Sequence, residues 1–266
     1  TDYYFSWILK NYPDSEAAAS LNLIMGHGLF AEKKYDKALE YYNRYMASGR
    51  ELDKGLVYYN ILICFYNLKR YDDVISTVRK GQFPAMEEDL WKEIPLILSR
   101  SYYHSGQHDR VYQIMFSDNM QSYSANDLSM FIDSALAVDD IDSAVKALEY
   151  LPVDSELRGK ALNAIGAYFL AKGNIDTSVE YYTTATLNPA QMVAENANLL
   201  LAEIHYRQGK YDDALARCEN IRMKELLLSS DAIRILCLFK TGKETQALNI
   251  ANKKMPLLSR IEYGRE

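Results

Sequence analysis

The chain has 266 residues, of which 48% are apolar and 25% are charged. These proportions are typical of a soluble globular protein and exclude a disordered chain or one built only of coiled coil. Gly and Pro are scarce, at 12 and 6 residues, which favours a mostly helical chain because both residues break helices. The net charge of −6 and the lack of a basic cluster argue against a nucleic-acid partner.

No apolar run reaches the roughly 18 residues of a membrane span, so we expect no direct membrane insertion. No basic-then-apolar leader follows Thr1, so no signal peptide is expected within this sequence. Both ends look cut from a longer chain. We expect residues 1–14 to be the last helix of a preceding repeat, ended at Tyr12-Pro13, and residues 257–266 to begin a closing helix.

A short phrase recurs between these ends. It reads Lys34-Tyr-Asp-Lys-Ala38, Arg70-Tyr-Asp-Asp-Val74 and Lys210-Tyr-Asp-Asp-Ala214, and degenerate copies fill the rest of the chain. We call the last residue of each phrase its anchor, and the anchors are Ala38, Val74, Val111, Ala144, Ser178, Ala214 and Ala247. They recur every 33 to 37 residues, a period that is typical of a repeat protein.

Each copy predicts two helices joined by a tight turn. The anchors are small or β-branched, so two helices can approach closely there. Two residues earlier, six copies have Asp, which complements the dipole at the start of a helix. Five residues before the anchor, four copies have a glycine that permits the left-handed end of the preceding helix. These glycines are Gly106, Gly173, Gly209 and Gly242.

The residues twelve and nine before each anchor and four after it form a stripe of small and large side chains, as in a packed helical hairpin. With this stripe the chain resembles an array of tetratricopeptide repeats, in about seven copies over almost its whole length. Copy five, with Gly166, Phe169, Gly173 and Leu187-Asn188-Pro189, is nearest the family consensus. The resemblance implies an all-α, right-handed superhelical solenoid of antiparallel helix pairs.

We predict one solenoid over residues 1–266, with repeats at about 15–50, 51–86, 87–123, 124–153, 154–189, 190–223 and 224–256. Copies three and four depart most from the family. A small residue is expected at positions 99 and 132, and Ser99 and Ile132 depart from that expectation to different degrees. Pro95 is expected in the first turn of its helix, where proline is tolerated.

No sequence motif for phosphate binding or nucleophilic catalysis is present, so we expect no enzyme, no catalytic residue, no metal and no cofactor. His104 and His108 are spaced like a metal pair, but the expected turn separates them. Asp139-Asp140-Ile141-Asp142 lacks the Gly and Glu of a calcium loop. Cys64, Cys218 and Cys237 are expected to be buried free thiols, with a Cys218–Cys237 disulfide as the alternative.

The resemblance also implies that the first helix of each pair lines a concave groove that binds a peptide or helix of a protein partner. The groove positions lie 15, 11 and 8 residues before each anchor and are rich in aromatic and aliphatic residues in the first three copies. An exposed apolar patch marks a binding site, whereas packing against neighbouring helices is the alternative interpretation. The candidate partner-binding residues are Leu23, His27, Phe30, Tyr59, Ile63, Tyr66, Arg100, Tyr103 and Tyr206.

Some members of the family hold a C-terminal carboxylate with a clamp of Lys, Asn and Arg. Here only Lys160 and Asn163 resemble part of that clamp, so apolar anchors in a hydrophobic groove are expected instead. The sequence therefore predicts a non-catalytic interaction scaffold. The alternatives are a structural module that self-associates and a sensor domain of a larger, envelope-associated protein.

The segment from Phe5 to Ala17 resembles a joint, Tyr-Pro-x-Ser-x-x-Ala, of bacterial envelope repeat proteins such as Tol-associated coordinators and outer-membrane assembly lipoproteins. This second resemblance covers one joint only. It favours a bacterial origin and leaves the cytoplasm and the bacterial periplasm open as locations.

Overall fold

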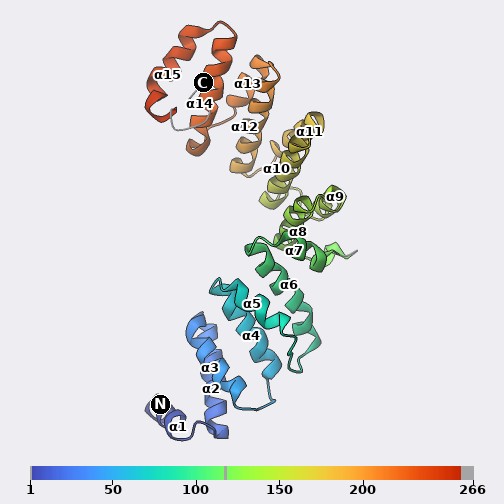
Figure 1. Ribbon diagram of the computed structural model, residues 1–266. Helices are drawn as coiled ribbons and strands as arrows, with labels where there is room; N and C mark the ends of the chain where they lie inside the picture. The colour runs from blue at the N-terminus through green and yellow to red at the C-terminus, as the bar shows by residue number, and fades with distance from the viewer. Residues whose placement is uncertain (1, 117–118, 259–266) are drawn as a thin grey trace. The chain divides into compact units, whose positions relative to one another are not determined.

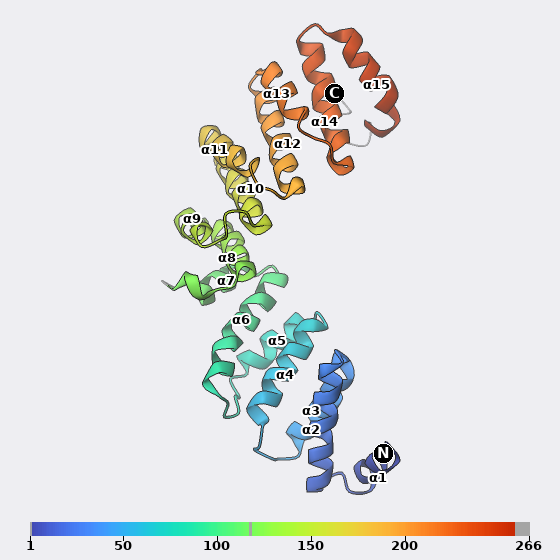
Figure 2. The ribbon, with the colours of Figure 1, turned by 180° about the vertical axis from the view of Figure 1, so that it is seen from behind.

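The computed structural model describes residues 2–116 and 119–258, and these residues form helices joined by short turns and loops (Figures 1 and 2). The chain divides into two compact units, residues 1–118 and 119–266. Unit 1 contains α1 (Asp2–Asn11), α2 (Glu16–Ala31), α3 (Tyr35–Ala47), α4 (Lys54–Asn67), α5 (Tyr71–Arg79), α6 (Glu88–His104) and α7 (His108–Met115). Unit 2 contains the 3-10 helix η1 (Met120–Ser122), α8 (Ala125–Ala137), α9 (Ile141–Glu149), α10 (Glu156–Ala171), α11 (Ile175–Ala185), α12 (Gln191–Arg207), α13 (Tyr211–Cys218), α14 (Lys224–Lys240) and α15 (Glu244–Leu258).

From α2 onward, consecutive helices pack as antiparallel pairs (Figure 1). In unit 1 these pairs are α2–α3, α4–α5 and α6–α7, and the second helix of each of the first two pairs also packs on the first helix of the next pair. In unit 2, α8–α9, α10–α11, α12–α13 and α14–α15 pack in the same manner. The described residues are therefore all-α, and within each unit the helical hairpins stack as in an α-solenoid, so that each pair buries its apolar face against its neighbours.

The turn inside each pair ends the first helix with a residue in the left-handed conformation. Four of these residues are the glycines expected from the sequence, with φ between 72° and 77°, so that prediction is confirmed. Copies one, two and four place Lys33, Lys69 and Asp139 there, at φ of 59°, 58° and 68°. In all seven turns the next amide donates to a carbonyl five residues back, as Lys34 N does to Leu29 O at 2.9 Å, which caps the helix end.

The seven anchor residues are buried with 0% exposure, which confirms the expectation that two helices approach closely at them. Around two of them the packing leaves room for no side chain. A Cβ atom on Gly26 would lie 2.7 Å from ring carbons of Tyr42, and one on Gly166 would lie 2.9 Å from the ring of Tyr182. Glycine on the first helix therefore makes room for a buried tyrosine on the second.

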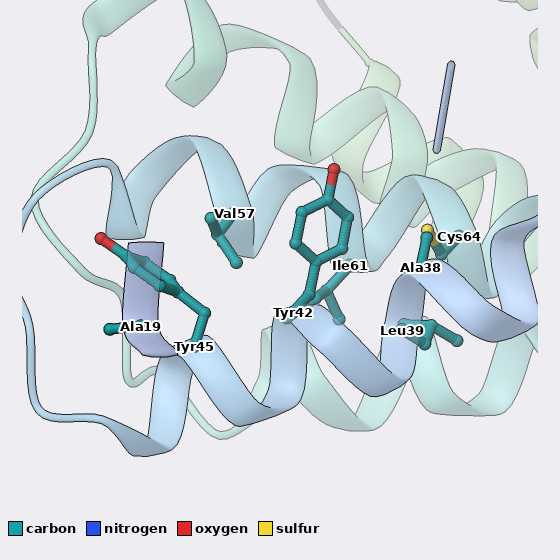
Figure 3. Packing of buried hydrophobic residues seen from close by; sticks show 8 residues of the cluster. All are labelled: Ala19, Ala38, Leu39, Tyr42, Tyr45, Val57, Ile61 and Cys64. Carbon is teal, nitrogen blue, oxygen red and sulfur yellow. The ribbon is translucent and has the colours of Figure 1, made fainter. Parts of the chain in front are cut away.

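The first core cluster shows how successive helices share this packing (Figure 3). Tyr42 and Tyr45 of α3 lie in it, and side chains of α2 and α4 complete it. The remaining members are Ala19, Ala38, Leu39, Val57, Ile61 and Cys64. The core of each unit is thus distributed along the stack of helices, and each pair depends on contact with the next.

Pro95 does not lie in the first turn of its helix, and that prediction is wrong. The helix α6 begins at Glu88, so Pro95 is inside it. A proline there removes one intrahelical hydrogen bond because it has no amide hydrogen. Its side chain is exposed.

The three cysteines are free and buried, as the sequence predicts, and no bridge joins Cys218 to Cys237. Burial raises the pKa of the Cys64 and Cys237 thiols to about 12, and it also raises the pKa of Cys218. All three therefore remain protonated thiols near neutral pH, with low reactivity because the thiolate is the nucleophile.

The helix α15 runs through Leu258, so residues 257 and 258 belong to it, and the rest of the expected closing helix lies outside the described residues. In the ranges that the structure covers, no helix is both long and apolar enough to cross a bilayer.

Candidate functional site

Eight of the nine candidate residues lie in unit 1, on the first helices of its three pairs. We call these eight the candidate face. The helix α2 contributes Leu23, His27 and Phe30, α4 contributes Tyr59, Ile63 and Tyr66, and α6 contributes Arg100 and Tyr103. Each of these side chains is half-buried. They are thus neither part of the closed core nor free in solvent, and each presents part of its surface outward.

One aromatic side chain of the candidate face on each helix is held by a second ring from the helix that follows. Phe30 meets Tyr35 edge-on at 5.7 Å between ring centroids, and Tyr66 meets Tyr71 edge-on at 5.6 Å. Tyr103 meets His108 in the same way at 5.4 Å. The two rings are always five residues apart and lie on either side of the turn. These contacts fix the orientation of each half-exposed ring, since edge-to-face pairs are favourable.

The second ring of each pair is not among the candidate residues that the sequence predicts. Tyr35 and Tyr71 belong to the recurring Tyr-Asp phrase, and His108 takes the same place in copy three. The constant spacing of five residues between two aromatic positions is the signal that would have revealed them.

An aromatic cluster joins α4, α5 and α6 at one end of the candidate face. The imidazole of His104 stacks on the ring of Tyr71, with centroids 4.6 Å apart and an interplanar angle of 15°. The hydroxyl of Tyr66 lies 3.2 Å from His104 Nε2. His104 ends α6 and His108 begins α7, so the two histidines lie on different helices, as expected. His104 therefore joins two neighbouring pairs through Tyr66 and Tyr71.

Tyr59 lies near two charged side chains of α6. Burial raises the pKa of the Tyr59 phenol, the negative charge of Glu93 raises it further, and the positive charge of Arg100 opposes both. The phenol therefore remains neutral near pH 7 and can donate or accept a hydrogen bond. The middle of the candidate face combines an aromatic ring with one charge of each sign.

His27 connects the candidate face to the buried core. Its Nδ1 lies 2.9 Å from the hydroxyl of Tyr42, which also accepts a hydrogen bond of 3.2 Å from Nδ2 of Asn60. The Tyr42 side chain has 0% exposure. Burial raises the pKa of Tyr42 to about 12, although the bond from Asn60 works in the opposite direction. This network ties α2, α3 and α4 together directly behind the face.

The aliphatic members of the candidate face also pack inward. Leu23 contacts the cluster around Tyr42, and Ile63 contacts the next cluster, which contains Leu62 and Val74. The alternative interpretation, packing against neighbouring helices, thus describes one side of these side chains, and partner binding stays a prediction for the other side. They support the core with one side, and only their outward sides are available to a partner.

Tyr206, the ninth candidate, lies in unit 2. Its ring contacts Tyr211 at 5.9 Å, again across a turn and five residues apart, and it packs on the cluster that holds Cys218 and Cys237. The equivalent positions on α8 and α10 are more polar, with Ser129, Asp133 and Asn163 among them. Tyr206 and Phe239 are the aromatic residues of unit 2 that lie eight residues before an anchor, as Phe30, Tyr66 and Tyr103 do in unit 1, and of these two only Tyr206 has a second ring five residues later.

The two residues that resemble part of a carboxylate clamp have partners within the chain. Lys160 Nζ pairs with Glu156 at 2.6 Å, and Asn163 Nδ2 donates to the carbonyl oxygen of Val193 at 3.3 Å. Among the residues that the structure describes, no group of three or more His, Cys, Asp or Glu side chains is placed to hold a metal ion.

No known family profile matches the chain, and no curated protein is similar to it in sequence. Among solved structures, it is similar to the TPR2AB domain of yeast Sti1 in a complex with pHSP90. That similarity has a TM-score of 0.37 and 13% identity, and it covers 94% of this chain and 95% of the other. It is also similar to the TPR domain of P58(IPK), with a TM-score of 0.29 and 14% identity over 98% and 79% of the two chains.

Proposed function

We propose that unit 1 is a non-catalytic interaction module that binds a peptide or a helix of a protein partner along the candidate face. The observation that carries this proposal is the set of half-exposed rings of Phe30, Tyr66 and Tyr103, each held by a second ring across a turn. Side chains that are already fixed lose little conformational entropy on binding, which favours affinity. Aromatic residues and arginine are also the usual anchors of protein interfaces.

The candidate face offers an apolar contact surface with few charges. Leu23 and Ile63 supply aliphatic surface, and Tyr59, Arg100 and Tyr103 supply polar ends that can orient a bound chain. Such a surface suits a partner segment that presents apolar side chains at regular spacing, as an amphipathic helix or an extended peptide does. Tyr206 would provide a separate contact in unit 2.

The test is an affinity comparison between the wild-type protein and a Tyr59→Ala/Tyr66→Ala/Tyr103→Ala variant. Partners captured by the wild type from a lysate of the source cell would be identified, and the affinity of a purified partner would then be measured for both proteins. Loss of a central anchor costs about 2 kcal/mol or more at an interface hot spot. We therefore expect the variant to bind at least about 30-fold more weakly, since each 1.4 kcal/mol is a factor of ten.

Tyr41→Ala is the matched control, because Tyr41 is a half-buried tyrosine of the same unit that lies on α3, under the guanidinium of Arg44. It should bind the partner normally. Circular dichroism must show that each variant keeps its helices. Equal binding by the folded triple variant and the wild type would disprove the proposal, and a mass that rises with concentration for the isolated chain would favour self-association.

A further inference from the structure

A cleft of about 440 Å³ opens where α4 and α6 begin. It lies on the N-terminal side of Tyr59, the first aromatic residue of the candidate face on α4. Leu56 of α4 lines it together with Met86 and Leu90, and the acidic residues Asp53 and Glu87 belong to its lining as well. The cleft therefore combines an aliphatic interior with two acidic side chains.

Backbone packing fixes the shape of this cleft. A Cβ atom on Gly55 would lie 2.5 Å from the carbonyl oxygen of Ala85 and 2.7 Å from Cα of Met86. The start of α4 and the segment before α6 thus meet at a place where no side chain fits. Asp53, just before α4, has a φ of 55°, a left-handed conformation that Asp and Asn tolerate better than most residues. This contact holds together the two backbone segments that carry the side chains of the cleft.

The rim of the cleft carries an excess of negative charge. Segments 51–54 and 87–92 contain five acidic and two basic side chains. Both basic side chains are paired, Lys54 with Glu51 at 2.7 Å and Lys92 with Glu88 at 3.0 Å. Within the described part of the chain, neither Asp53 nor Glu87 has a basic partner. Glu88 and Asp89 both contact Lys92 and lie outside the lining. The two helix starts supply only about half a positive charge each, so the negative charges of Asp53 and Glu87 prevail in the cleft.

The cleft continues the stripe of half-exposed residues on α4. Leu56, Tyr59, Ile63 and Tyr66 are spaced by three, four and three residues, so they lie along one side of the helix. The Leu56 side chain is 40% exposed, more than expected for a leucine whose only role is packing. A bound segment that follows this side of α4 would reach the cleft at the N-terminal end of the helix.

We propose that the cleft binds a basic segment of a protein partner. An aliphatic side chain of that segment enters between Leu56, Met86 and Leu90, and the lysines or arginines that flank it contact Asp53 and Glu87. The inference deepens the proposed function and rests on it, since it names the chemistry that the partner presents at one end of the candidate face. Charge complementarity of this kind controls which partners bind more than it adds raw affinity.

The probe is a short, fluorescently labelled peptide in which lysines flank a pair of leucines. Its binding to the whole chain is measured by fluorescence anisotropy at low and high salt. Two peptides serve as comparisons, one with glutamate in place of each lysine and one with serine in place of each leucine. The wild type should bind the first peptide alone, and more weakly at high salt because exposed charges are then screened.

Two variants test the two halves of the cleft. Asp53→Asn/Glu87→Gln removes both charges without changing the shape of the cleft, and asparagine keeps the left-handed backbone accessible at position 53. Leu56→Ser removes one apolar wall. Each should weaken binding of the lysine–leucine peptide by about tenfold, as expected for the loss of charged or apolar contacts. The charge variant should also lose most of the salt dependence.

Glu88→Gln/Asp89→Asn is the matched control. It removes two charges from the first turn of the same helix, but both carboxylates lie outside the cleft and contact Lys92. It should change the affinity by less than about twofold, as is usual for exposed ion pairs. Circular dichroism confirms that every variant is folded.

The proposal is wrong if the lysine–leucine peptide fails to bind, if the glutamate peptide binds as tightly, or if the charge variant and the control behave alike. Tyr59→Ala/Tyr103→Ala separates this result from the proposed function. Normal binding of the protein partner by that variant, together with weaker binding by the cleft variants, would disprove the proposed function and support the cleft. The opposite pattern would disprove the cleft and support the candidate face.

Discussion

The helix pairs α2–α3 and α4–α5 fill the space between their two helices with different side chains. Twelve residues before the anchor and four after it, the first pair has Gly26 and Tyr42, whereas the second has Leu62 and Val78. All four are buried. In the first pair a glycine lies opposite a large tyrosine side chain, whereas in the second pair two side chains of medium size lie opposite each other. The helices thus require a total volume at their crossing rather than particular residues, which is how cores tolerate substitution.

The tyrosine of the first pair makes polar contacts that the valine of the second pair cannot make. The Tyr42 hydroxyl reaches Asn60 on the next pair and His27 on the candidate face, whereas Val78 has no polar group with which to do so. A large polar residue at this position therefore couples neighbouring pairs, and the same change should cost more in the first pair than in the second.

Tyr42→Ala should produce the largest loss of stability. It removes a fully buried ring and leaves a cavity between α2 and α3, and such truncations cost about 3–5 kcal/mol. Val78→Ala, its counterpart in the second pair, removes two methyl groups and should cost clearly less. The free energy of unfolding from urea titrations followed by circular dichroism measures both. Equal losses would show that the ring of Tyr42 contributes no more than an aliphatic side chain.

Gly26→Leu should have the next largest effect, because even a Cβ atom at this position would lie 2.7 Å from the Tyr42 ring. Overpacking of this kind costs about 1–3 kcal/mol. Combining it with Tyr42→Val rebuilds the Leu62 and Val78 arrangement of the second pair and should recover much of the stability that either change alone removes. A double-mutant cycle measures this coupling. Strictly additive losses would contradict the requirement for a constant total volume.

The sequence predicts much of this fold because the signals are local. The anchors, the glycines of the turns and the acidic first turns each depend on residues within one helical hairpin. Pro95 was misplaced since the start of α6 at Glu88 is set by the long segment before it, which carries no periodic pattern. Lys33 and Lys69 were not expected to be left-handed, because lysine has no particular preference for that conformation.

The candidate site is less predictable for a related reason. Spacing alone places Phe30, Tyr66 and Tyr103 at equivalent helix positions, and the structure gives each of them partial exposure. The stacking of His104 on Tyr71 joins two different pairs, so it depends on how the pairs stack rather than on any one repeat. The cleft beside Gly55 arises in the same way, from the approach of segment 85–87 to the start of α4.

Asn22→Leu should stabilise the first pair. The equivalent residue of the second pair, Tyr58, is buried, whereas Asn22 lines a cavity of about 350 Å³ and its buried Oδ1 has no hydrogen-bond partner among the residues that the structure describes. Leu128 fills the same repeat position in unit 2 and is 2% exposed. Removing an unsatisfied polar atom and filling space should raise the free energy of unfolding by about 1–2 kcal/mol. Tyr58→Leu is the control, and it should not stabilise. A less stable Asn22→Leu protein would show that Asn22 has a structural role, such as holding water in the cavity.

Tyr42→Phe should have the smallest effect at neutral pH and a distinctive dependence on pH. It removes hydrogen bonds to His27 and Asn60 at a cost of about 0.5–1.5 kcal/mol. The pKa of Tyr42 is about 12 in the folded protein, against 10.0 for an ordinary tyrosine. Above pH 10 the unfolded chain therefore loses the proton that the folded chain still holds, and this lowers the stability of the wild type alone. The advantage of the wild type over Tyr42→Phe should be complete below pH 10 and should shrink as the pH rises toward 12.

Urea midpoints of the two proteins across this range of pH measure the difference. Val78→Ala is the control, because it removes no titratable group and its cost should stay constant with pH. A constant gap between the wild type and Tyr42→Phe would mean that the Tyr42 hydroxyl ionises as readily in the folded chain as in the unfolded one. In that case the hydroxyl would be accessible to water, and the network behind the candidate face would be too open to couple the first two helix pairs.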